Sequence, residues 1–277
     1  MKVSLSLFNE TILKTEKRRH MNILMLGDVT DPRSVEYIRE HLFDVRRARK
    51  IDFVTVNAEN AAFLGGAGPE LADSLFAAGA DVLTGGNHTM QTLSIHAYME
   101  DHPCMLRPLN YPPEVPGAGY TIADACGYRM LVISLLGVVD MVPVLDNPFS
   151  AIDRLLVREA GHYDFAVLDF HAEASGEKMA MGRYLDGRVH VIAGTHTHVP
   201  TADACILPNG SGYVSDLGMC GPTNGVLGIR TDVVLARNVQ RLPARYEPAD
   251  GDIRAEGVVF SLNTDTGRVQ SVERIAF

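Results

Sequence analysis

An apolar run in the second half of the chain changes to polar residues within ten positions: Val189-His190-Val191-Ile192-Ala193-Gly194-Thr195-His196-Thr197-His198. Its first five residues are typical of a buried strand. In open α/β sheets, ligands bind in the crevice beyond the carboxyl ends of the strands. We therefore expect His196 and His198 to face such a crevice, where imidazoles one residue apart can reach two neighbouring ions.

Three earlier apolar runs also end in polar clusters. Residues 22–26 end at Gly27-Asp28, residues 53–56 end at Asn57-Ala58-Glu59-Asn60, and residues 81–83 lead into Gly85-Gly86-Asn87-His88. Amphipathic stretches at 34–49 and 70–78 separate these runs and predict helices. This alternation is typical of a layered α/β domain, and its sheet gathers the residues at the strand ends along one edge.

The rest of the chain extends this pattern. Clustered prolines and glycines predict a loop over residues 107–120, and the run 165–168 leads into Asp169-Phe170-His171-Ala172-Glu173. We predict one domain with two packed sheets over residues 21–277. Residues 1–20 are interpreted as a dispensable leader, because their basic residues follow the apolar ones, the reverse of the order in a secretory signal. Further elements are expected as a helix at 151–160, strands near 120–122, 130–136, 206–207, 212–214, 258–260 and 269–272, and a helix after 214.

The composition excludes several classes of protein. A net charge of -9 argues against a surface for long nucleic acids, which bind to basic stripes. The four cysteines show no Cys-x-x-Cys spacing, so neither a zinc ribbon nor a redox motif is indicated, and a reduced cytoplasm suits them best. No apolar run approaches the roughly 18 residues that a membrane span needs, so no membrane partner is expected. Homo-oligomer formation stays open.

The polar clusters are ambiguous singly and informative together. Asp28 alone would be read as a turn or helix cap, and a lone His171 is more often structural. Carboxylates, amide oxygens and imidazoles combined suit Mn, Fe, Zn or Mg rather than ions that prefer thiolates. Two divalent ions about 3.5–4 Å apart repel each other, and a shared carboxylate and hydroxide lower that cost. Glu59 is the natural bridge, and the bridging water becomes the nucleophile.

These motifs resemble the calcineurin-like metallophosphoesterase superfamily, whose usual order is an early Asp, a carboxylate, Gly-Asn-His, a lone His and Gly-His-x-His. They are more closely similar to the bacterial YmdB-like phosphodiesterases, from Met21 to about Gly228. The motifs that carry this likeness are Gly27-Asp28-Val29, Asn57-Ala58-Glu59-Asn60-Ala61, Gly86-Asn87-His88-Thr89, Arg107-Pro108-Leu109-Asn110-Tyr111-Pro112, His171-Ala172-Glu173, Glu177-Lys178, Gly194-Thr195-His196-Thr197-His198 and Asp216-Leu217-Gly218-Met219.

The resemblance implies a four-layer α/β/β/α sandwich of two mixed sheets flanked by helices. It also implies a dinuclear iron or manganese centre, with Zn or Mg as further options, that hydrolyses small phosphodiesters, 2',3'-cyclic nucleotides being the family's reported substrates. By matched position, Asp28, Asn60 and His198 would hold one ion, Glu59 would bridge, and Asn87, His171 and His196 would hold the other. His88, left free of metal, would stabilise the transition state or protonate the leaving alkoxide.

Some positions depart from the superfamily's pattern. Thr30 stands where the superfamily's Asp-x-His opening has its imidazole; YmdB-like relatives share this loss and offer the Asn60 position instead. Asp31, Met90 and Pro200 differ from the residues that those relatives tend to carry beside the ligands. Metal-bound imidazoles usually donate their second N–H to a carboxylate or carbonyl. The candidates for that role are Asp169, Glu173, Asp203 and Asp216, and Glu177-Lys178 could hold the loop that carries His171.

Two other functions stay open. A mononuclear zinc hydrolase could use three of the histidines, but it would leave Asp28, Asn60 and Asn87 without a role. A metal-binding signalling or regulatory protein of the same fold, with weak or no turnover, could keep the metals while the changed residues beside them abolish activity.

Overall fold

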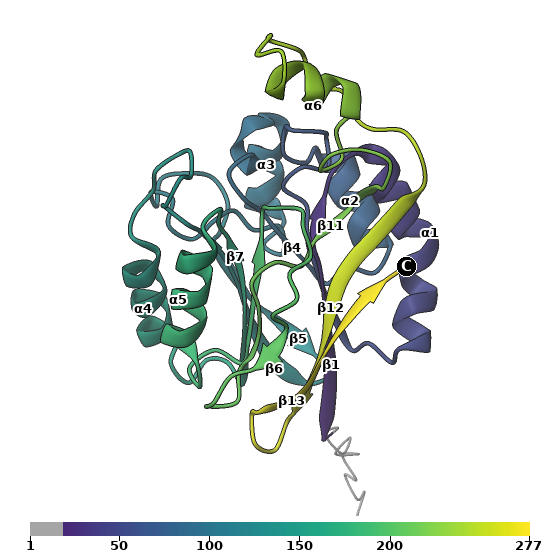
Figure 1. Cartoon of the computed structure of the whole chain (residues 1–277). Coiled ribbons are helices and arrows are strands. Elements are labelled where there is room, and N and C mark those ends of the chain that lie inside the picture. Colours follow the sequence, from purple (N-terminus) through teal and green to yellow (C-terminus); the bar gives the residue numbers. More distant parts are fainter. Residues whose placement is uncertain (1–18) are drawn as a thin grey trace, which may run out of the picture.

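The computed structural model describes residues 19–277, in which two β-sheets lie face to face between two layers of helices (Figure 1). The first sheet has the strand order β2-β11-β12-β1-β3-β4, and β13 pairs with β12. Its strands are β1 (His20–Leu26), β2 (Asp28–Val29), β3 (Phe53–Asn57), β4 (Val82–Thr84), β11 (Met219–Pro222), β12 (Ile253–Asn263) and β13 (Val269–Ala276).

The second sheet has the order β5-β6-β7-β8-β10-β9. Both sheets are mixed: β1, β3 and β4 run parallel, as do β6, β7, β8 and β10, and antiparallel strands extend each group. The strands of the second sheet are β5 (Tyr120–Ala125), β6 (Tyr128–Leu136), β7 (Phe165–His171), β8 (Val191–Thr195), β9 (Cys205–Ile206) and β10 (Gly212–Val214).

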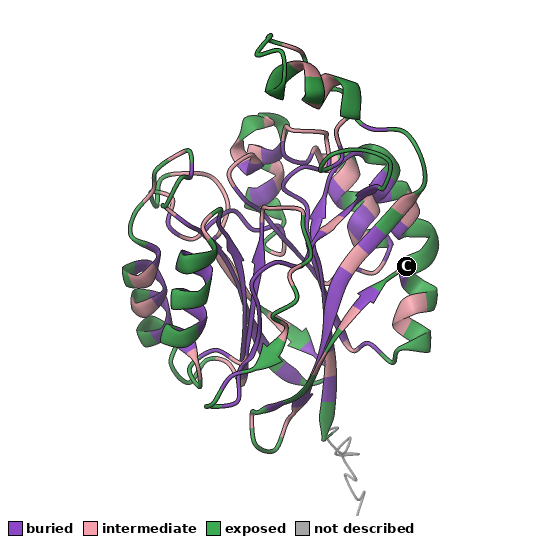
Figure 2. Ribbon diagram, in the orientation of Figure 1, coloured by how far each residue is buried: buried purple, intermediate pink, exposed green. Residues whose placement is uncertain are grey.

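The helices form the two outer layers, apart from α6, which has no buried residue and lies at the top of the molecule in Figures 1 and 2. The helices of residues 19–277 are α1 (Pro32–Ala48), α2 (Pro69–Ala77), α3 (Ser94–Asp101), α4 (Pro148–Arg158), α5 (Ser175–Leu185), α6 (Thr231–Asn238) and the short 3-10 helix η1 (Thr89–Gln91). None of them combines the length and apolar composition that a membrane crossing requires.

Three apolar cores separate the four layers. Along β1, Ile23 and Met25 belong to the core between the sheets, whereas Leu24 and Leu26 belong to the core under α1 and α2. The alternation follows from the two-residue repeat of a strand, which sends successive side chains to opposite faces. A third core joins the second sheet to α4 and α5. The predicted four-layer α/β/β/α sandwich is thereby confirmed.

Several element boundaries differ from the prediction. β1 begins at His20, so the last residue of the predicted leader lies in the sheet, and residues 1–18 of that leader lie outside the described residues. β8 begins at Val191, two residues later than predicted, because Asp186 and Val189 already form a separate bridge. The helices α3 and α5 and the strand β11 were not predicted. α5 contains two glycines, Gly176 and Gly182, which are poor helix formers and hide its pattern.

Candidate metal centre

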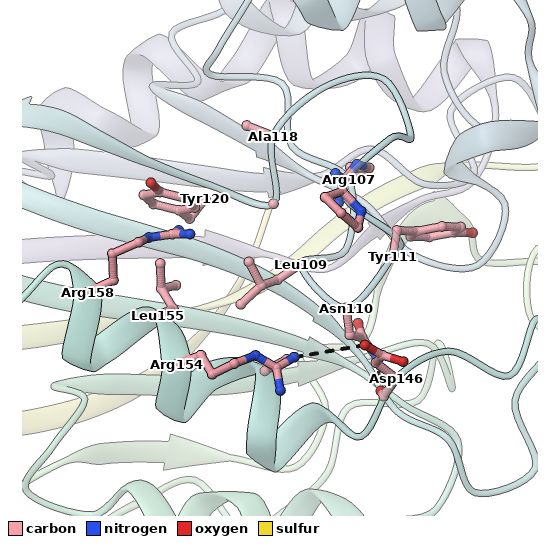
Figure 3. Close-up of a pocket in the computed structure, with 13 residues that line it drawn as sticks. Arg107, Leu109, Asn110, Tyr111, Ala118, Tyr120, Asp146, Arg154, Leu155 and Arg158 are labelled. Carbon is pink, nitrogen blue, oxygen red and sulfur yellow. Dashed lines mark hydrogen bonds and ion pairs between the residues drawn. The ribbon is translucent and has the colours of Figure 1, made fainter.

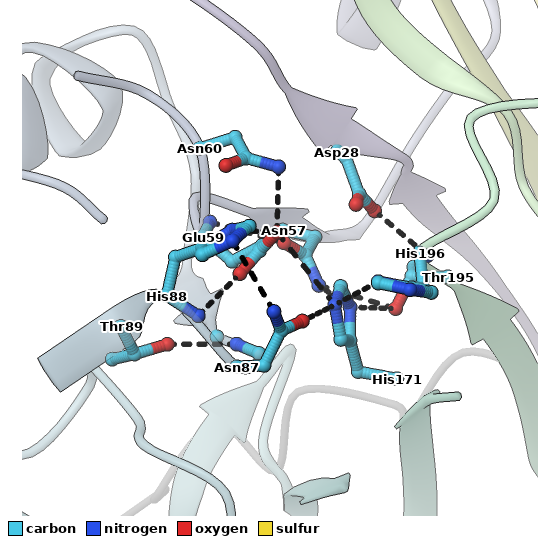
Figure 4. A network of polar contacts seen from close by, with 12 residues as sticks. Asp28, Asn57, Glu59, Asn60, Asn87, His88, Thr89, His171, Thr195 and His196 are labelled. Atoms are coloured by element: carbon cyan, nitrogen blue, oxygen red, sulfur yellow. Dashed lines mark hydrogen bonds and ion pairs between the residues drawn. The ribbon is translucent and has the colours of Figure 1, made fainter. Parts of the chain in front are cut away.

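Strand ends from both sheets bring the predicted ligands together (Figure 4). Asp28 lies directly after β1, Glu59 and Asn60 follow β3, and Asn87 follows β4. The second sheet contributes His171 at the end of β7 and the turn with His196 and His198 after β8. One ligand atom from each of Glu59, His171 and His196 lies within 4.8 Å of the other two. This group holds three of the seven predicted ligands, and the other four contact its members or one another: Asn60 contacts Glu59, Asn87 contacts His171, Asp28 accepts from the backbone of His196, and His198 contacts Asp28.

Glu59 occupies the centre of this cluster and is 1% exposed. Its Oε1 lies 2.6 Å from Nδ2 of Asn60, 3.0 Å from Nδ1 of His88 and 3.7 Å from Nε2 of His171. Its Oε2 accepts a hydrogen bond of 2.8 Å from the backbone N–H of His88. Burial would raise the pKa of Glu59, but the imidazoles around it lower that pKa below its usual value. Glu59 is therefore an ionised carboxylate between two groups of side chains.

The first group consists of Asp28, Asn60 and His198. Nε2 of His198 lies 3.2 Å from Oδ2 of Asp28 and 3.5 Å from Nδ2 of Asn60. Burial alone would lower the pKa of His198, but contact with the Asp28 carboxylate raises it to about 9. Burial has the opposite effect on a carboxylate and would raise the pKa of Asp28. The surrounding imidazoles outweigh burial and hold the pKa of Asp28 below its usual range.

The second group consists of Asn87, His171 and His196. Nε2 of His171 lies 3.0 Å from Oδ1 of Asn87 and 3.0 Å from Nδ1 of His196. Burial lowers the pKa of His171 to about 4, so this imidazole is neutral, which is the form that binds metals. Gly86 makes room for it, because a Cβ at that position would lie 2.4 Å from Nε2 of His171.

Unpartnered buried atoms test whether this site suits cations. Oδ1 of Asn60 is one of the three enclosed side-chain atoms in residues 19–277 that have no hydrogen-bond partner, and Oδ2 of Asp28, another of the three, has only the ion-pair contact of 3.2 Å with Nε2 of His198. A buried oxygen without a donor costs free energy, and a bound cation removes that cost. Rotation of the Asn60 carboxamide by half a turn would bring its oxygen toward Glu59 and His198. The residues present therefore fit the metal ions that the fold implies.

Buried hydrogen bonds orient His171 from behind. The Thr195 hydroxyl donates to Oδ1 of Asp169 over 2.7 Å and lies 2.9 Å from Nδ1 of His171. Because its own proton goes to Asp169, Thr195 accepts the proton of Nδ1, and Nε2 of His171 presents its lone pair to the cluster. Asn57 and Thr84 also donate to Asp169, whose pKa burial raises to about 7.

The turn that carries His196 and His198 is held by a buried ion pair. Oδ2 of Asp216 accepts hydrogen bonds from the backbone N–H and the hydroxyl of Thr197, at 3.0 Å and 2.8 Å, and lies 2.7 Å from Nζ of Lys178. Both histidines have left-handed backbones, with φ of 104° at His196 and 63° at His198. Non-glycine residues hold such angles only where the surroundings impose them.

The remaining predicted residues have different places. His88 contacts Glu59, and its side chain is 23% exposed. Glu173 lies 3.1 Å from Nε2 of His196, whereas Asp203 binds Ser215 and Thr201 and touches no histidine. Asp31 caps α1 by accepting from the backbone of residues 33 and 34, and Thr30 donates to the carbonyl of Cys220. Sequence reasoning gave no role to Asn57, Thr84 and Thr195, and their one signal is a polar side chain at the last position of an apolar strand.

The fold and this cluster define a class of protein. Solved structures with the same architecture include a phosphatase from Mycoplasma pneumoniae, with a TM-score of 0.87, 30% identity and 93% of each chain covered. A hypothetical protein from Thermus thermophilus has a TM-score of 0.84 and 36% identity, with 93% of this chain and 99% of that chain covered. The chain is a hydrolase of the metallophosphoesterase type.

The family can be given more narrowly. Residues 24–275 match the model of the family described as YmdB-like protein. The chain is also 39% identical over 255 residues to the 2',3'-cyclic-nucleotide 2'-phosphodiesterase of Bacillus subtilis (strain 168). The aligned residues make up 92% of this chain and 96% of that relative. This chain belongs to the YmdB-like family.

Proposed function

We propose that the chain hydrolyses small phosphodiesters, specifically 2',3'-cyclic nucleotides, at a centre of two metal ions, iron or manganese. The arrangement of Glu59 carries this proposal, because its carboxylate lies between two groups that each offer three ligands. Asp28, Asn60 and His198 would hold one ion, Asn87, His171 and His196 the other, and Glu59 would bridge them. When bound, two such ions acidify a water molecule and polarise the oxygens of a phosphate group.

His88 is proposed as the catalytic residue. It contacts Glu59 through Nδ1, which leaves Nε2 toward the Asn87 carboxamide at 3.3 Å, and its ring lines the open cleft. Burial would lower its pKa, but the Glu59 carboxylate raises it above its usual value, which favours the protonated ring. In the proposed reaction, water adds to phosphorus and the bond to the ribose 2' oxygen breaks. His88 gives its proton to that oxygen, the proton that the attacking water loses returns to His88 through solvent, and a nucleoside 3'-phosphate is released.

The cleft over the cluster suits a mononucleotide. Its volume is about 280 Å³, and its lining combines the apolar residues Leu64, Leu227 and Ile229 with Glu173 and three histidines. Small-molecule sites typically measure about 300–1,000 Å³, so this cleft is slightly smaller than the lower limit of that range. The apolar residues offer a surface for a base, while the polar residues receive the phosphate.

The state of the cysteines bears on the proposed location. Cys104, Cys126, Cys205 and Cys220 form no disulfide, which supports a location in the reducing cytoplasm.

Metal analysis combined with turnover tests the proposal. We expect two ions per chain in the purified protein, and hydrolysis of bis(p-nitrophenyl) phosphate and 2',3'-cyclic AMP when manganese is added. One ion per chain would support a mononuclear site instead. Two ions without hydrolysis of either substrate would overturn the enzymatic proposal in favour of a metal-binding regulatory protein.

A further inference from the structure

A second, larger cavity lies between α4 and the loop that precedes β5 (Figure 3). It measures about 380 Å³, which is within the usual range for a small-molecule site. None of its lining residues lines the cleft over the metal centre. The cavity is therefore distinct in its lining from that cleft, although Tyr111 on its wall, whose pKa burial raises, is also near enough for the charge of Glu59 to raise that pKa.

Three arginines line this cavity, although the chain as a whole is acidic. Arg154 and Arg158 stand one helical turn apart on α4, and their side chains are 67% and 60% exposed. The nearest carboxylate to Arg154 is Asp146, at 3.9 Å, which is too long for a hydrogen bond. Arg158 binds Glu159 through Nε and lies over the Tyr120 ring, 5.0 Å from its centroid.

Arg107 is the third arginine and is buried, with 6% exposure. It donates to the carbonyls of Val115, Pro116 and Pro108, and it forms no ion pair within residues 19–277. Its hydrogen bonds use Nε and Nη1, and its Nη2 has no hydrogen bond in that part of the chain and is not fully enclosed. A buried cation without an anionic partner is costly, and an anion in the cavity would offset that cost.

The remaining walls are apolar and aromatic. Leu109 and Leu155 lie between the arginines, with Tyr111 on one side and Tyr120 on the other (Figure 3). Guanidinium groups suit phosphate because their geometry allows paired hydrogen bonds, and flat apolar surfaces suit an aromatic base. Asp146 at the rim is the one carboxylate among the lining residues, and Arg154 offsets its charge.

We propose that this cavity is a second nucleotide-binding site, in which Arg154 and Arg158 hold the phosphate and the base packs on Leu109, Leu155 and Tyr111. A nucleoside monophosphate fits the cavity's size and combines the two chemistries that its walls offer. The site does not depend on the proposed hydrolysis, since it shares no lining residue with the metal cleft.

Calorimetric titration of the full, metal-loaded chain with adenosine 5'-monophosphate tests this site. The double variant Arg154→Gln, Arg158→Gln should bind the nucleotide at this site about tenfold or more weakly, because two charge-assisted contacts are lost. The matched control is Arg39→Gln, Arg47→Gln, which removes two arginines from exposed ion pairs on α1. It should bind like the wild type, and both double variants should hydrolyse bis(p-nitrophenyl) phosphate at the wild-type rate.

Hydrogen–deuterium exchange of the wild type places the ligand without any substitution. We expect adenosine 5'-monophosphate to slow exchange in residues 107–120 and 148–158, with less protection by adenosine and by inorganic phosphate. Equal binding by the two double variants would overturn the proposal, as would protection confined to the segments of the metal cleft. Protection by inorganic phosphate equal to that by the nucleotide would overturn the assignment of a base to the apolar walls.

Discussion

Nε2 of His171 and Nδ1 of His196 face each other at 3.0 Å, with their rings inclined at 73°. The Thr195 contact leaves Nε2 of His171 without a proton, so the pair can form a hydrogen bond only if His196 supplies one. Nε2 of His171 also lies 3.0 Å from Oδ1 of Asn87 and 3.7 Å from Oε1 of Glu59, an arrangement that supports the proposed role of these groups as ligands of one cation. This relationship makes the roles of the neighbouring residues testable.

His88→Ala should lower kcat while both metal ions stay bound. The side chain is assigned to proton transfer, which typically contributes about 10²–10⁴-fold to a rate. In the same preparation, turnover of 2',3'-cyclic AMP should therefore fall while the metal content stays at two ions per chain. Loss of an ion together with activity would contradict this role and make His88 a ligand.

Thr195→Val should weaken metal binding without leaving a cavity in the protein core. The substitution keeps the shape of the side chain and removes the hydroxyl between Asp169 and His171. Loss of a group that orients a metal ligand typically costs about 10–100-fold in metal affinity or activity. Titration with manganese against a competing chelator measures the change.

Thr195→Ser is the matched control, because it retains the hydroxyl. The serine variant should bind manganese nearly as well as the wild type. Equal weakening in both variants would contradict a specific role of the hydroxyl, because serine keeps the hydroxyl and lacks only the methyl group.

The difference between ligands and supporting residues shows what the sequence could predict. Asp28, Glu59 and His196 were found because each follows an apolar strand, and the ends of parallel strands meet at one edge. Their supports cross between the sheets: Asn57 and Thr84 come from β3 and β4 of the first sheet, whereas Asp169 and Thr195 come from β7 and β8 of the second. The alternation of polar and apolar residues along one strand does not reveal which strand of the other sheet that strand will face.

The cavity beside α4 was beyond prediction for a related reason. Arg154 and Arg158 look like ordinary charges on the exposed face of an amphipathic helix, a position that usually has no function. Only the path of the loop over residues 107–120 brings Arg107 and Tyr111 opposite them. Loop conformation depends on single hydrogen bonds, such as those of Asn110 with the backbone of Leu136, which leave no pattern in the sequence.

Asp216→Asn should destabilise the protein strongly. The carboxamide could still accept from Thr197, but Lys178, which is 2% exposed, would become a buried cation without a partner. Removal of one member of a buried ion pair typically costs about 3–5 kcal/mol of unfolding free energy. Urea denaturation measures this change.

The exposed pair of Asp153 and Arg188 supplies the control for that experiment. Their side chains are each 40% exposed, so Asp153→Asn should change the unfolding free energy by less than about 1 kcal/mol. Similar effects of the two substitutions would contradict the view that Asp216 and Lys178 form a buried clamp on the turn with the two histidines.

His190 should make stability depend on pH, independently of the metal centre. Burial lowers its pKa to about 4, and its Nδ1 accepts a hydrogen bond of 3.0 Å from the backbone N–H of Ala166. In the unfolded chain a histidine titrates near pH 6.5. Between pH 6.5 and 4 the His190 imidazole is therefore protonated in the unfolded chain and neutral in the folded chain. The contribution of His190 is therefore complete above pH 6.5 and is lost as the pH falls toward 4.

His190→Asn isolates this contribution, because asparagine offers an acceptor to Ala166 and does not titrate. All other groups titrate equally in both proteins, so the difference between their unfolding free energies should change by up to about 1.4 kcal/mol per pH unit within that window. Wild-type stability should fall more steeply than that of the variant as the pH decreases from 6.5 to 4.5. Parallel curves would mean that His190 gains its proton without leaving its place beside Phe165, and that its burial does not exclude the charged ring.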